Sequence, residues 1–249
     1  MIVCLAGMHR SGTSLFSSYL QHCGISMGED MATAGPGNKH GHFEDRTFLE
    51  LHKEILKDND THMYCNPGQL SISTTQKESA RSLINNNRIK HDHWGWKDPR
   101  TTLFLDLWNE IAPDAKFLIL YREPFAVIDS LFRRKGERFL FIKPIMAADA
   151  WLLYNNRLIE FYNKHPKKCL IANINGINNS PKHSLPIISK WLEYDLSKPY
   201  SDVYHPKDIA ISPSRITKLY LPIIKAFRGH ALDKTYNKLE ELAAISSPK

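Results

Sequence analysis

The stretch IVCLAGMHRSGTSLFSSYL, residues 2–20, decides the fold predicted for this chain. Its first five residues are apolar and partly β-branched, and two glycines, Gly7 and Gly12, bound the polar loop that follows. From Leu15 onward, apolar residues recur at helical spacing. We therefore expect a buried strand, a tight loop and a helix, an arrangement that binds phosphate groups.

The start of such a helix attracts anions, because its first backbone N–H groups have no partner within the helix and carry the positive end of the helix dipole. Gly7 and Gly12 allow the backbone to curl close to a phosphate group. The hydroxyl groups of the loop can donate further hydrogen bonds to the phosphate, and Arg10 adds a fixed positive charge. The residues expected to bind the phosphate are His9, Arg10, Ser11, Gly12, Thr13 and Ser14.

The loop keeps the glycine spacing of the NTP-hydrolysing loop G-x-x-x-x-G-K-[ST] but has Thr13 in place of the lysine. Its cation is Arg10, two residues before the second glycine. An x-[RK]-S-G-T-[ST] loop of this kind resembles the 5′-phosphosulfate-binding loop of the sulfotransferases. That family transfers a sulfuryl group from 3′-phosphoadenosine-5′-phosphosulfate (PAPS) to a hydroxyl or amine. The resemblance implies PAPS as cofactor, 3′,5′-adenosine bisphosphate as product, and no metal.

Length and composition describe an ordinary globular protein. The 249 residues are 42% hydrophobic and 24% charged, so a core can form without a metal or disulfide. The four cysteines form no C-x-x-C pair, which argues against a zinc site and a redox motif. No cleavable signal is visible in this sequence, and no apolar run approaches about 20 residues, so we predict a cytoplasmic protein without stable membrane insertion.

The net charge of +7 indicates an anionic partner. Nucleic acid is one such partner, but the basic residues are spread along the chain and are not interleaved with aromatic residues. A nucleotide with several phosphates accounts for the charge equally well. We therefore predict no nucleic-acid partner; a steep salt dependence of binding to any duplex would favour one.

Strands and helices are expected to alternate along the chain, which predicts an α/β fold, three-layered and P-loop-like, with a central parallel sheet and helices on both faces. Ligands of such sheets bind outside the carboxyl ends of the strands, where Arg10, Lys97 and Arg122 are expected. Further strands are predicted at 93–97, 116–121 and 169–174, and helices at 48–56, 74–90, 101–111, 124–135, 142–164 and 181–192.

Residues 1–249 are interpreted as a single sulfotransferase-like domain. An α/β core is expected over 1–195 and a mostly helical extension over 196–249. The extension is predicted to hold two helices, at 213–228 and 234–245.

Two stretches, 24–41 and 58–73, are predicted to be long loops, because they are rich in residues that favour turns. We expect these loops and the C-terminal helices to shape the acceptor site.

A second motif follows the strand at 116–121. Arg122 stands at its tip, and Ser130 lies nearly two turns into a helix that starts at Pro124. The sulfotransferases have R-[DEN]-P-x-x-x-x-x-S here, and its arginine and serine bind the 3′-phosphate of PAPS. The resemblance implies this role for Arg122 and Ser130, and a guanidinium suits a phosphate dianion. Two phosphate sites, one for each end of the nucleotide, indicate a bisphosphorylated cofactor.

The catalytic base is expected in the stretch FEDR, residues 43–46, at or near a helix N-terminus. The stretch resembles G-E-E-T-R of the protein-tyrosine sulfotransferases, which implies that Glu44 accepts the proton of the acceptor hydroxyl. Asp45 is the alternative. Because other sulfotransferases use histidine, the remaining candidates are His9, His40 and His42.

The stretch KDP at residues 97–99 resembles the K-D-P of the same enzymes, whose lysine stabilises the transferring group. In-line sulfuryl transfer needs such stabilisation, because negative charge grows on the departing phosphate oxygen. We assign this role to Lys97 and to Arg10, which cannot donate a proton at neutral pH. Arg100 is a weaker candidate.

The resemblance covers roughly the first 135 residues, and the R-K-G-x-x-G-x-W loop of the cytosolic enzymes is absent, which points to bacterial or Golgi-type kin. The predicted function is in-line sulfuryl transfer from PAPS to a small-molecule, glycan, lipid or peptide acceptor, with no indication of oligomeric state. One alternative is a P-loop nucleotide or small-molecule kinase, which would need Mg²⁺ and a loop lysine. Another is a non-catalytic binder of 3′,5′-bisphosphorylated adenosine, which could lose Glu44 and Lys97 without effect.

Overall fold

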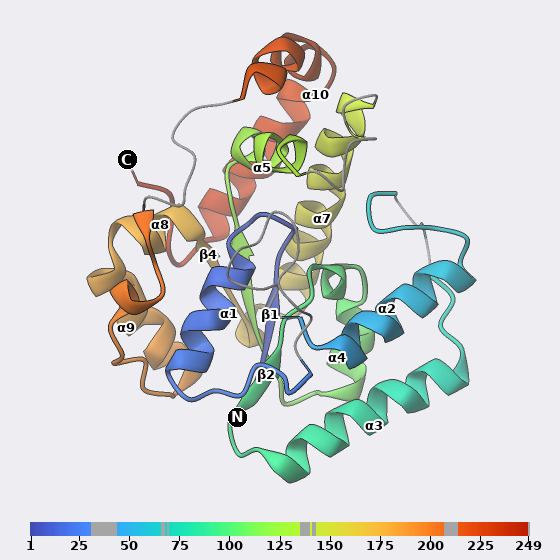
Figure 1. The fold of residues 1–249 in the computed structure, drawn as a ribbon, viewed down its shortest axis with the longest axis vertical. Coiled ribbons are helices and arrows are strands. Elements are labelled where there is room, and N and C mark those ends of the chain that lie inside the picture. Colours follow the sequence, from blue (N-terminus) through green and yellow to red (C-terminus); the bar gives the residue numbers. More distant parts are fainter. Residues whose placement is uncertain are drawn as a thin grey trace.

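Four parallel strands form the centre of the molecule (Figure 1). A computed structural model of the chain describes residues 1–30, 44–65, 68, 70–134, 140, 143–206 and 214–248. The strands are β1 (Ile2–Ala6), β2 (Trp94–Trp96), β3 (Lys116–Tyr121) and β4 (Cys169–Asn173), in the order β2-β1-β3-β4. Because every neighbouring pair is parallel, the carboxyl ends of all four strands lie at one edge of the sheet.

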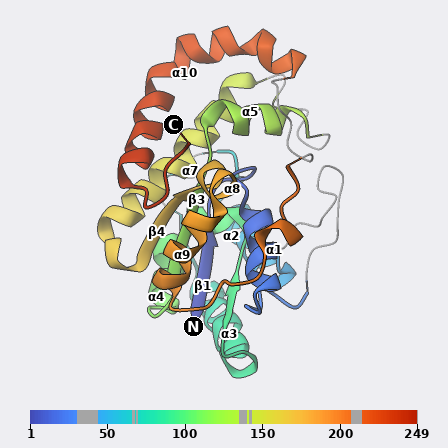
Figure 2. The same ribbon diagram turned by 90° about the vertical axis from the view of Figure 1, so that its left-hand side faces the viewer.

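Helices cover both faces of this sheet, which confirms the predicted three-layer α/β arrangement (Figures 1 and 2). Alternate side chains of β1 enter different apolar clusters, with Cys4 and Ala6 on one face and Val3 and Leu5 on the other. The first cluster includes α2 (Arg46–Asp58), α3 (Thr74–Lys90), α4 (Leu105–Ile111) and α7 (Pro144–Lys164), and the second α1 (Thr13–His22), α8 (Ile174–Asn179) and α9 (Pro181–Leu192).

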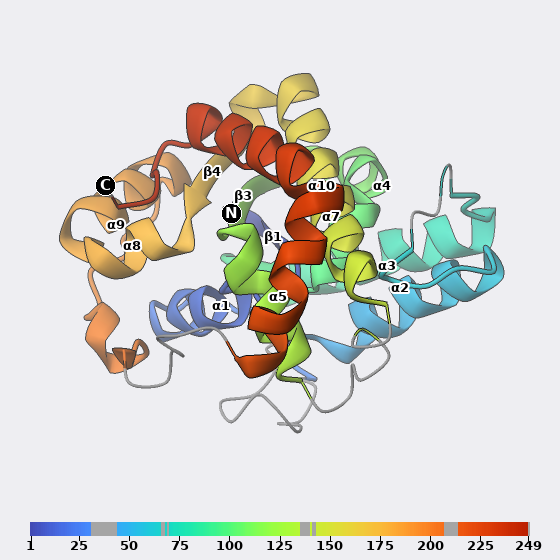
Figure 3. The ribbon, with the colours of Figure 1, turned by 90° about the horizontal axis from the view of Figure 1, so that it is seen from above.

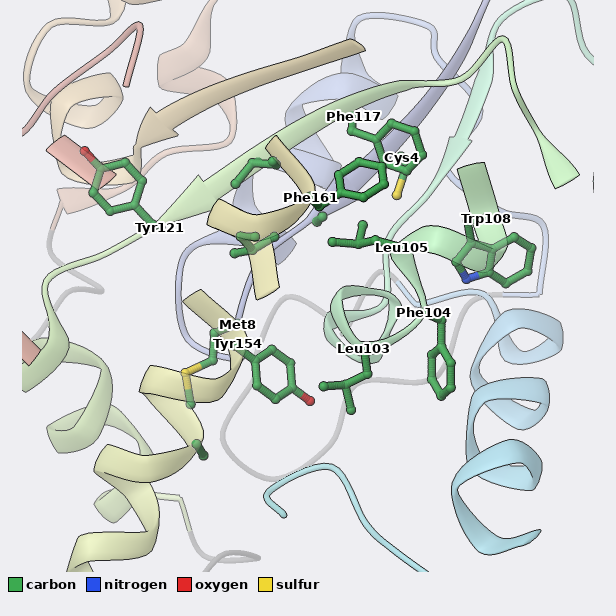
Figure 4. Packing of buried hydrophobic residues seen from close by; sticks show 14 of the residues in the cluster. Cys4, Met8, Leu103, Phe104, Leu105, Trp108, Phe117, Tyr121, Tyr154 and Phe161 are labelled. Atoms are coloured by element: carbon green, nitrogen blue, oxygen red, sulfur yellow. The ribbon is translucent and has the colours of Figure 1, made fainter. Parts of the chain in front are cut away.

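The first cluster is rich in large aromatic side chains, several of which Figure 4 shows between the sheet and the neighbouring helices. Trp94, Trp96 and Trp108 are almost completely buried in it. Phe48 of α2 stacks on Trp96 with ring centroids 5.3 Å apart. These contacts hold α2, and the residues just before it, against the strand that leads to Lys97.

The C-terminal part of the chain differs from the prediction of two helices. Residues 215–242 form one helix, α10 (Arg215–Leu242), which packs against α7 and against α5 (Pro124–Phe132) (Figure 3). Leu232 and Thr235 are buried, so tertiary packing carries the helix through the expected break. Beyond it, Ile245 forms a parallel bridge with Ala172, which adds a short pairing at the free edge of β4.

Two smaller differences concern element boundaries. The helix predicted at 101–111 is divided at Phe104 into a 3₁₀ turn, η1 (Pro99–Leu103), and α4. The strand predicted at 169–174 ends at Asn173, because Ile174 begins the short helix α8. The Asn173 side chain caps this helix by accepting a hydrogen bond from the Asn175 backbone N–H at 2.9 Å.

Candidate functional site

The loop between β1 and α1 has a backbone that only small residues can adopt at its tightest points. Gly12 has φ of 82°, and a Cβ added there would lie 2.3 Å from Cγ1 of Ile174. A Cβ at Gly7 would lie 2.4 Å from the carbonyl oxygen of Leu120. Gly12 is the N-cap of α1 and has no side chain to fill the helix end, so the first N–H groups of α1 remain available to an anion.

Gly12→Ala is expected to lower the free energy of unfolding by about 3 kcal/mol or more, since it adds a clash to the cost of a positive φ. Gly68→Ala is the matched control, because Gly68 also has a positive φ of 61°, but no atom of the described residues lies within 4 Å of the added Cβ. The control should lose only about 1–2 kcal/mol. Urea unfolding of both variants measures the difference, and equal losses would contradict the clash at Ile174.

The two phosphate-binding motifs predicted from the sequence meet through a direct contact. Nε of Arg10 donates a hydrogen bond of 2.7 Å to Oγ of Ser130 on α5, and Nη1 of Arg122 lies 3.5 Å from the carbonyl oxygen of Arg10. Arg10 itself has φ of 70°, an unfavourable conformation for a residue with a side chain. Its guanidinium is therefore at the Ser130 end of the site, whereas the sequence analysis placed it only at the phosphate loop.

Arg10 and Arg122 bring positive charge to this junction, and Glu123 and Asp129 are the acidic groups whose charges act on Arg122. Among the residues that the structure describes, neither Arg10 nor Arg122 forms an ion pair. Burial lowers the pKa of Arg10, and the neighbouring charges of Arg134 and Arg122 lower it further. Burial also lowers the pKa of Arg122. Partly buried guanidinium groups that repel one another are suited to an anion of more than one negative charge.

Several buried polar atoms around the loop lack a hydrogen-bond partner within the described ranges, namely His9 Nε2, Ser11 Oγ and Arg122 Nε. Such atoms are rare in folded proteins, because each costs about 1–3 kcal/mol when its partner is missing. All three belong to the predicted phosphate-binding residues. The residues present therefore fit a phosphorylated ligand that would supply the missing partners.

A buried ion pair lies beside the start of α1. Nζ of Lys97, at the carboxyl end of β2, donates to Oε1 of Glu44 at 3.0 Å and to Oγ of Ser14 at 3.2 Å. The Lys97 side chain is completely buried, and this burial lowers its pKa although the Glu44 carboxylate partly offsets the effect. The structure thus brings Glu44, Lys97 and the phosphate loop together, from parts of the chain that are far apart in sequence.

Asp45, the alternative base, has a different role in the structure. It is the N-cap of α2, and Oδ1 accepts the Thr47 backbone N–H at 2.9 Å. Oδ2 accepts the Glu29 backbone N–H at 3.0 Å. Both oxygens are therefore used to fix the start of α2, which leaves Glu44 as the carboxylate beside Lys97. The other candidates His40 and His42 lie outside the described residues.

A hydrogen-bonded chain behind Glu44 was not predicted from the sequence. Nη1 of Arg100 lies 3.8 Å from Glu44 and 2.8 Å from Oδ1 of Asp98. Oδ2 of Asp98 accepts from Nδ1 of His52 at 2.8 Å, and Nε2 of His52 accepts from Trp108 Nε1 at 2.9 Å. Although burial raises the pKa of Asp98, Arg100 and His52 lower it well below the usual range. The sequence contains one signal for this hydrogen-bonded chain: His52 is a polar residue on the apolar face of the helix predicted at 48–56.

His9 is enclosed by two tyrosines that the sequence analysis did not select. Its ring centroid lies 5.9 Å from that of Tyr64 and 6.0 Å from that of Tyr154. Burial, followed by the charge of Arg100, lowers the pKa of His9 well below its ordinary value of 6.5, so the imidazole is neutral at pH 7. A cavity of about 1100 Å³ begins at Tyr64 and extends along α7, where Met146, Asp149, Leu153 and Arg157 contribute to its lining.

Two features, a metal-binding cluster and a membrane-spanning helix, are absent from the described ranges. No group of three or more His, Cys, Asp or Glu side chains in that part of the chain is placed to hold a metal ion. None of the helices described combines the length and the apolar character needed to cross a bilayer.

The fold and this site define an α/β protein with a phosphate loop and a second basic motif at the carboxyl edge of its sheet. Residues 3–174 match the family model described as Sulfotransferase family, and the chain belongs to this family. The matched segment holds the phosphate loop, Glu44, Lys97, Arg122 and Ser130. No curated protein sequence matches the chain.

Solved structures show the same fold at low sequence identity. The sulfotransferase domain from the curacin biosynthetic pathway is 13% identical, with a TM-score of 0.55 and coverage of 99% of this chain and 98% of that one. The sulfotransferase domain of the olefin synthase from Synechococcus PCC 7002 is 14% identical, with a TM-score of 0.55 and coverage of 100% and 90%. Sulfotransferase STF9 from Mycobacterium avium is 14% identical, with a TM-score of 0.52 and coverage of 93% and 76%.

Proposed function

We propose that the chain is a PAPS-dependent sulfotransferase that acts on a hydroxyl or amine acceptor. The observation that supports this most strongly is the 2.7 Å hydrogen bond from Arg10 to Ser130, which joins the phosphate loop to the second basic motif. A ligand with a phosphate at each end of one nucleoside would use both motifs, whereas a mononucleotide would use one. Family membership supports the same assignment.

The binding roles follow from the positions of the donors. The start of α1, with Ser11, Thr13 and Ser14, would bind the 5′-phosphosulfate. Arg122 and Ser130 would bind the 3′-phosphate, and Arg10 would lie between the two ends. His9, neutral and buried, would donate or accept a single hydrogen bond through Nε2.

PAPS supplies the sulfuryl group, and the acceptor oxygen gains a bond to sulfur as the bond from sulfur to the 5′-phosphate oxygen breaks. Glu44 takes the proton that the acceptor loses. Oε2 is the oxygen proposed for this step, because Lys97 donates to Oε1 and Arg100 Nη1 lies 3.8 Å from Oε2, beyond hydrogen-bond distance. Lys97 and Arg10 stabilise the negative charge that grows on the phosphate side. The chain from Arg100 to His52 would hold Glu44 in place as a positioning network. The acceptor would enter from the cavity beside Tyr64.

The rate is expected to fall at high pH, because a lysine that stabilises negative charge must be protonated. Burial lowers the pKa of Lys97 below its ordinary value of 10.5, so this fall begins below pH 10.5. The pKa of Lys97 is higher in the unfolded chain than in the folded protein. Between these two pKa values the unfolded state binds more protons, so the contribution of Lys97 to the free energy of unfolding increases as pH rises. Activity should therefore be lost without unfolding.

The pH profile of kcat/KM, which reports the pKa values of the free enzyme, checks this prediction when it is measured alongside the melting temperature. Lys97→Met is the matched control, and its reduced rate should be constant over the same alkaline range. An alkaline fall that persists unchanged in Lys97→Met would show that another group causes it.

A transfer assay tests the proposed function. Purified protein, ³⁵S-labelled PAPS and a panel of phenols, sugars, lipid alcohols and peptides are incubated with EDTA present. Label transferred to an acceptor, or slow release of sulfate without one, would support the proposal. Phosphoryl transfer from ATP that depends on Mg²⁺, with no reaction of PAPS, would favour the kinase alternative. Tight binding of 3′,5′-adenosine bisphosphate with no reaction of any kind would favour a non-catalytic binder.

The cytoplasm is the location we propose for this activity. The four cysteines, Cys4, Cys23, Cys65 and Cys169, are all free thiols in the structure, which accords with a reducing compartment.

A further inference from the structure

The first half of α10 exposes an unusual row of apolar side chains. Ile216, Leu219, Ile223 and Phe227 are exposed by 40, 70, 44 and 68%, and their spacing of three and four residues places them along one side of the helix. Folded proteins normally bury such a row, because removing large apolar side chains from water stabilises the protein. The row lies at the end of the molecule, where the first half of α10 crosses above α5 (Figures 2 and 3).

The same segment is strongly basic. Residues 214–232 contain four Lys or Arg residues and no Asp or Glu. Arg215, Lys218 and Lys225 are exposed, while Arg228 pairs with Asp149. Lys218 and Lys225 are seven residues apart and share a side of the helix different from that of the apolar row. The second half of α10 has acidic and basic residues in similar number, so the excess positive charge is confined to the exposed apolar half.

We propose that the first half of α10 docks on an anionic lipid surface, with the apolar row inserted among the headgroups. A helix with Leu, Ile and Phe on one side and Lys or Arg on the other binds the membrane interface through apolar burial and through attraction to anionic lipids. A second copy of the chain fits this surface less well, because pairing two such segments would bring together six cations, Arg215, Lys218 and Lys225 of each copy, with no acidic residue in either segment. The proposal does not depend on the sulfotransferase assignment.

Docking would also place the candidate site close to the membrane. The start of α10 is tied to α5, since Oδ1 of Asp129 accepts from the Ser214 backbone N–H at 2.7 Å and from Oγ1 of Thr217 at 2.6 Å. Asp129 is adjacent to Ser130, which Arg10 contacts. A protein held on the bilayer by this helix would therefore keep its site near acceptors that reside in or on the membrane.

Vesicle flotation tests the proposal with the full-length protein. Vesicles of phosphatidylcholine with one-third phosphatidylglycerol should bind the protein, and vesicles of phosphatidylcholine alone should bind it at least tenfold more weakly. The double variant Leu219→Ser/Phe227→Ser should bind the anionic vesicles at least tenfold more weakly than wild type. Lys218→Ala should weaken binding about fivefold and reduce its salt dependence, since one cation near an anionic surface contributes about 1 kcal/mol.

Ile89→Ser is the matched control, because Ile89 is 85% exposed on α3, remote from α10 in sequence, and should leave vesicle binding unchanged. Thermal melting of each variant verifies the fold. Equal binding to neutral and anionic vesicles, or binding unaffected by the double variant, would overturn the proposal. Two further results would overturn it. One is a protein that binds no vesicles and forms a dimer in sedimentation analysis, which the double variant dissociates. The other is a protein that binds no vesicles and specifically captures an acidic peptide.

Discussion

Glu44→Gln is expected to lower kcat by about 10²- to 10⁴-fold, the usual contribution of a positioned general base. The amide has the shape of the carboxylate and can still accept the hydrogen bond from Lys97, but it cannot take a proton from the acceptor. Binding of 3′,5′-adenosine bisphosphate should be undiminished or tighter, because the substitution removes a negative charge beside an anion site. Steady-state kinetics and calorimetry on the same preparation measure both effects.

Asp45→Asn is the control for this prediction. Asparagine caps a helix as well as aspartate does, so α2 should still begin at Arg46 with full activity retained. If Asp45→Asn lost the activity and Glu44→Gln kept it, the base would be Asp45. Full turnover in both variants would leave a histidine as the base and would exclude the role proposed for Glu44.

Arg10→Gly is expected to lower kcat/KM by about 10³-fold or more, since it removes a cation that faces both ends of the proposed ligand. The same change should raise the free energy of unfolding by about 1 kcal/mol. Glycine adopts the φ of 70° without strain, and the substitution removes a partly buried positive charge that has no ion-pair partner among the described residues. The lost hydrogen bond to Ser130 offsets part of this gain.

Urea unfolding and kinetics together check whether Arg10 is kept for function at the expense of stability. Arg10→Lys is the comparison, because it keeps the charge and the strained backbone but cannot donate from a guanidinium to Ser130. It should keep more activity than Arg10→Gly and gain no stability. A large loss of stability in Arg10→Gly would show that Arg10 is a structural residue.

Local patterns were sufficient to predict the elements that carry the site. The apolar runs of β1 and β3, the glycines of the phosphate loop and Pro124 at the start of α5 all act through neighbours in sequence, so the strands, the loop and the helix starts could be predicted. Lys97 at the tip of β2 and Glu44 just before α2 were predicted for the same reason.

Contacts between distant residues could not be predicted in this way. Arg10 and Ser130 are 120 positions apart, and His52 and Asp98 are 46 apart. Each of these pairs depends on how two layers of the fold pack, which no local pattern encodes. The continuity of α10 likewise depends on the burial of Leu232 against the rest of the protein.

The central claim is that two phosphate-binding motifs form one site for a bisphosphorylated nucleotide, and calorimetric binding tests it most directly. The ligands are 3′,5′-adenosine bisphosphate, AMP, ADP and ATP, each with and without Mg²⁺, for wild type and Arg122→Ala. We predict a preference for the bisphosphate that is independent of Mg²⁺, with loss of about 100-fold in affinity for it in Arg122→Ala and little change for AMP. Equal binding of AMP and the bisphosphate, or a preference for ATP with Mg²⁺, would contradict the account.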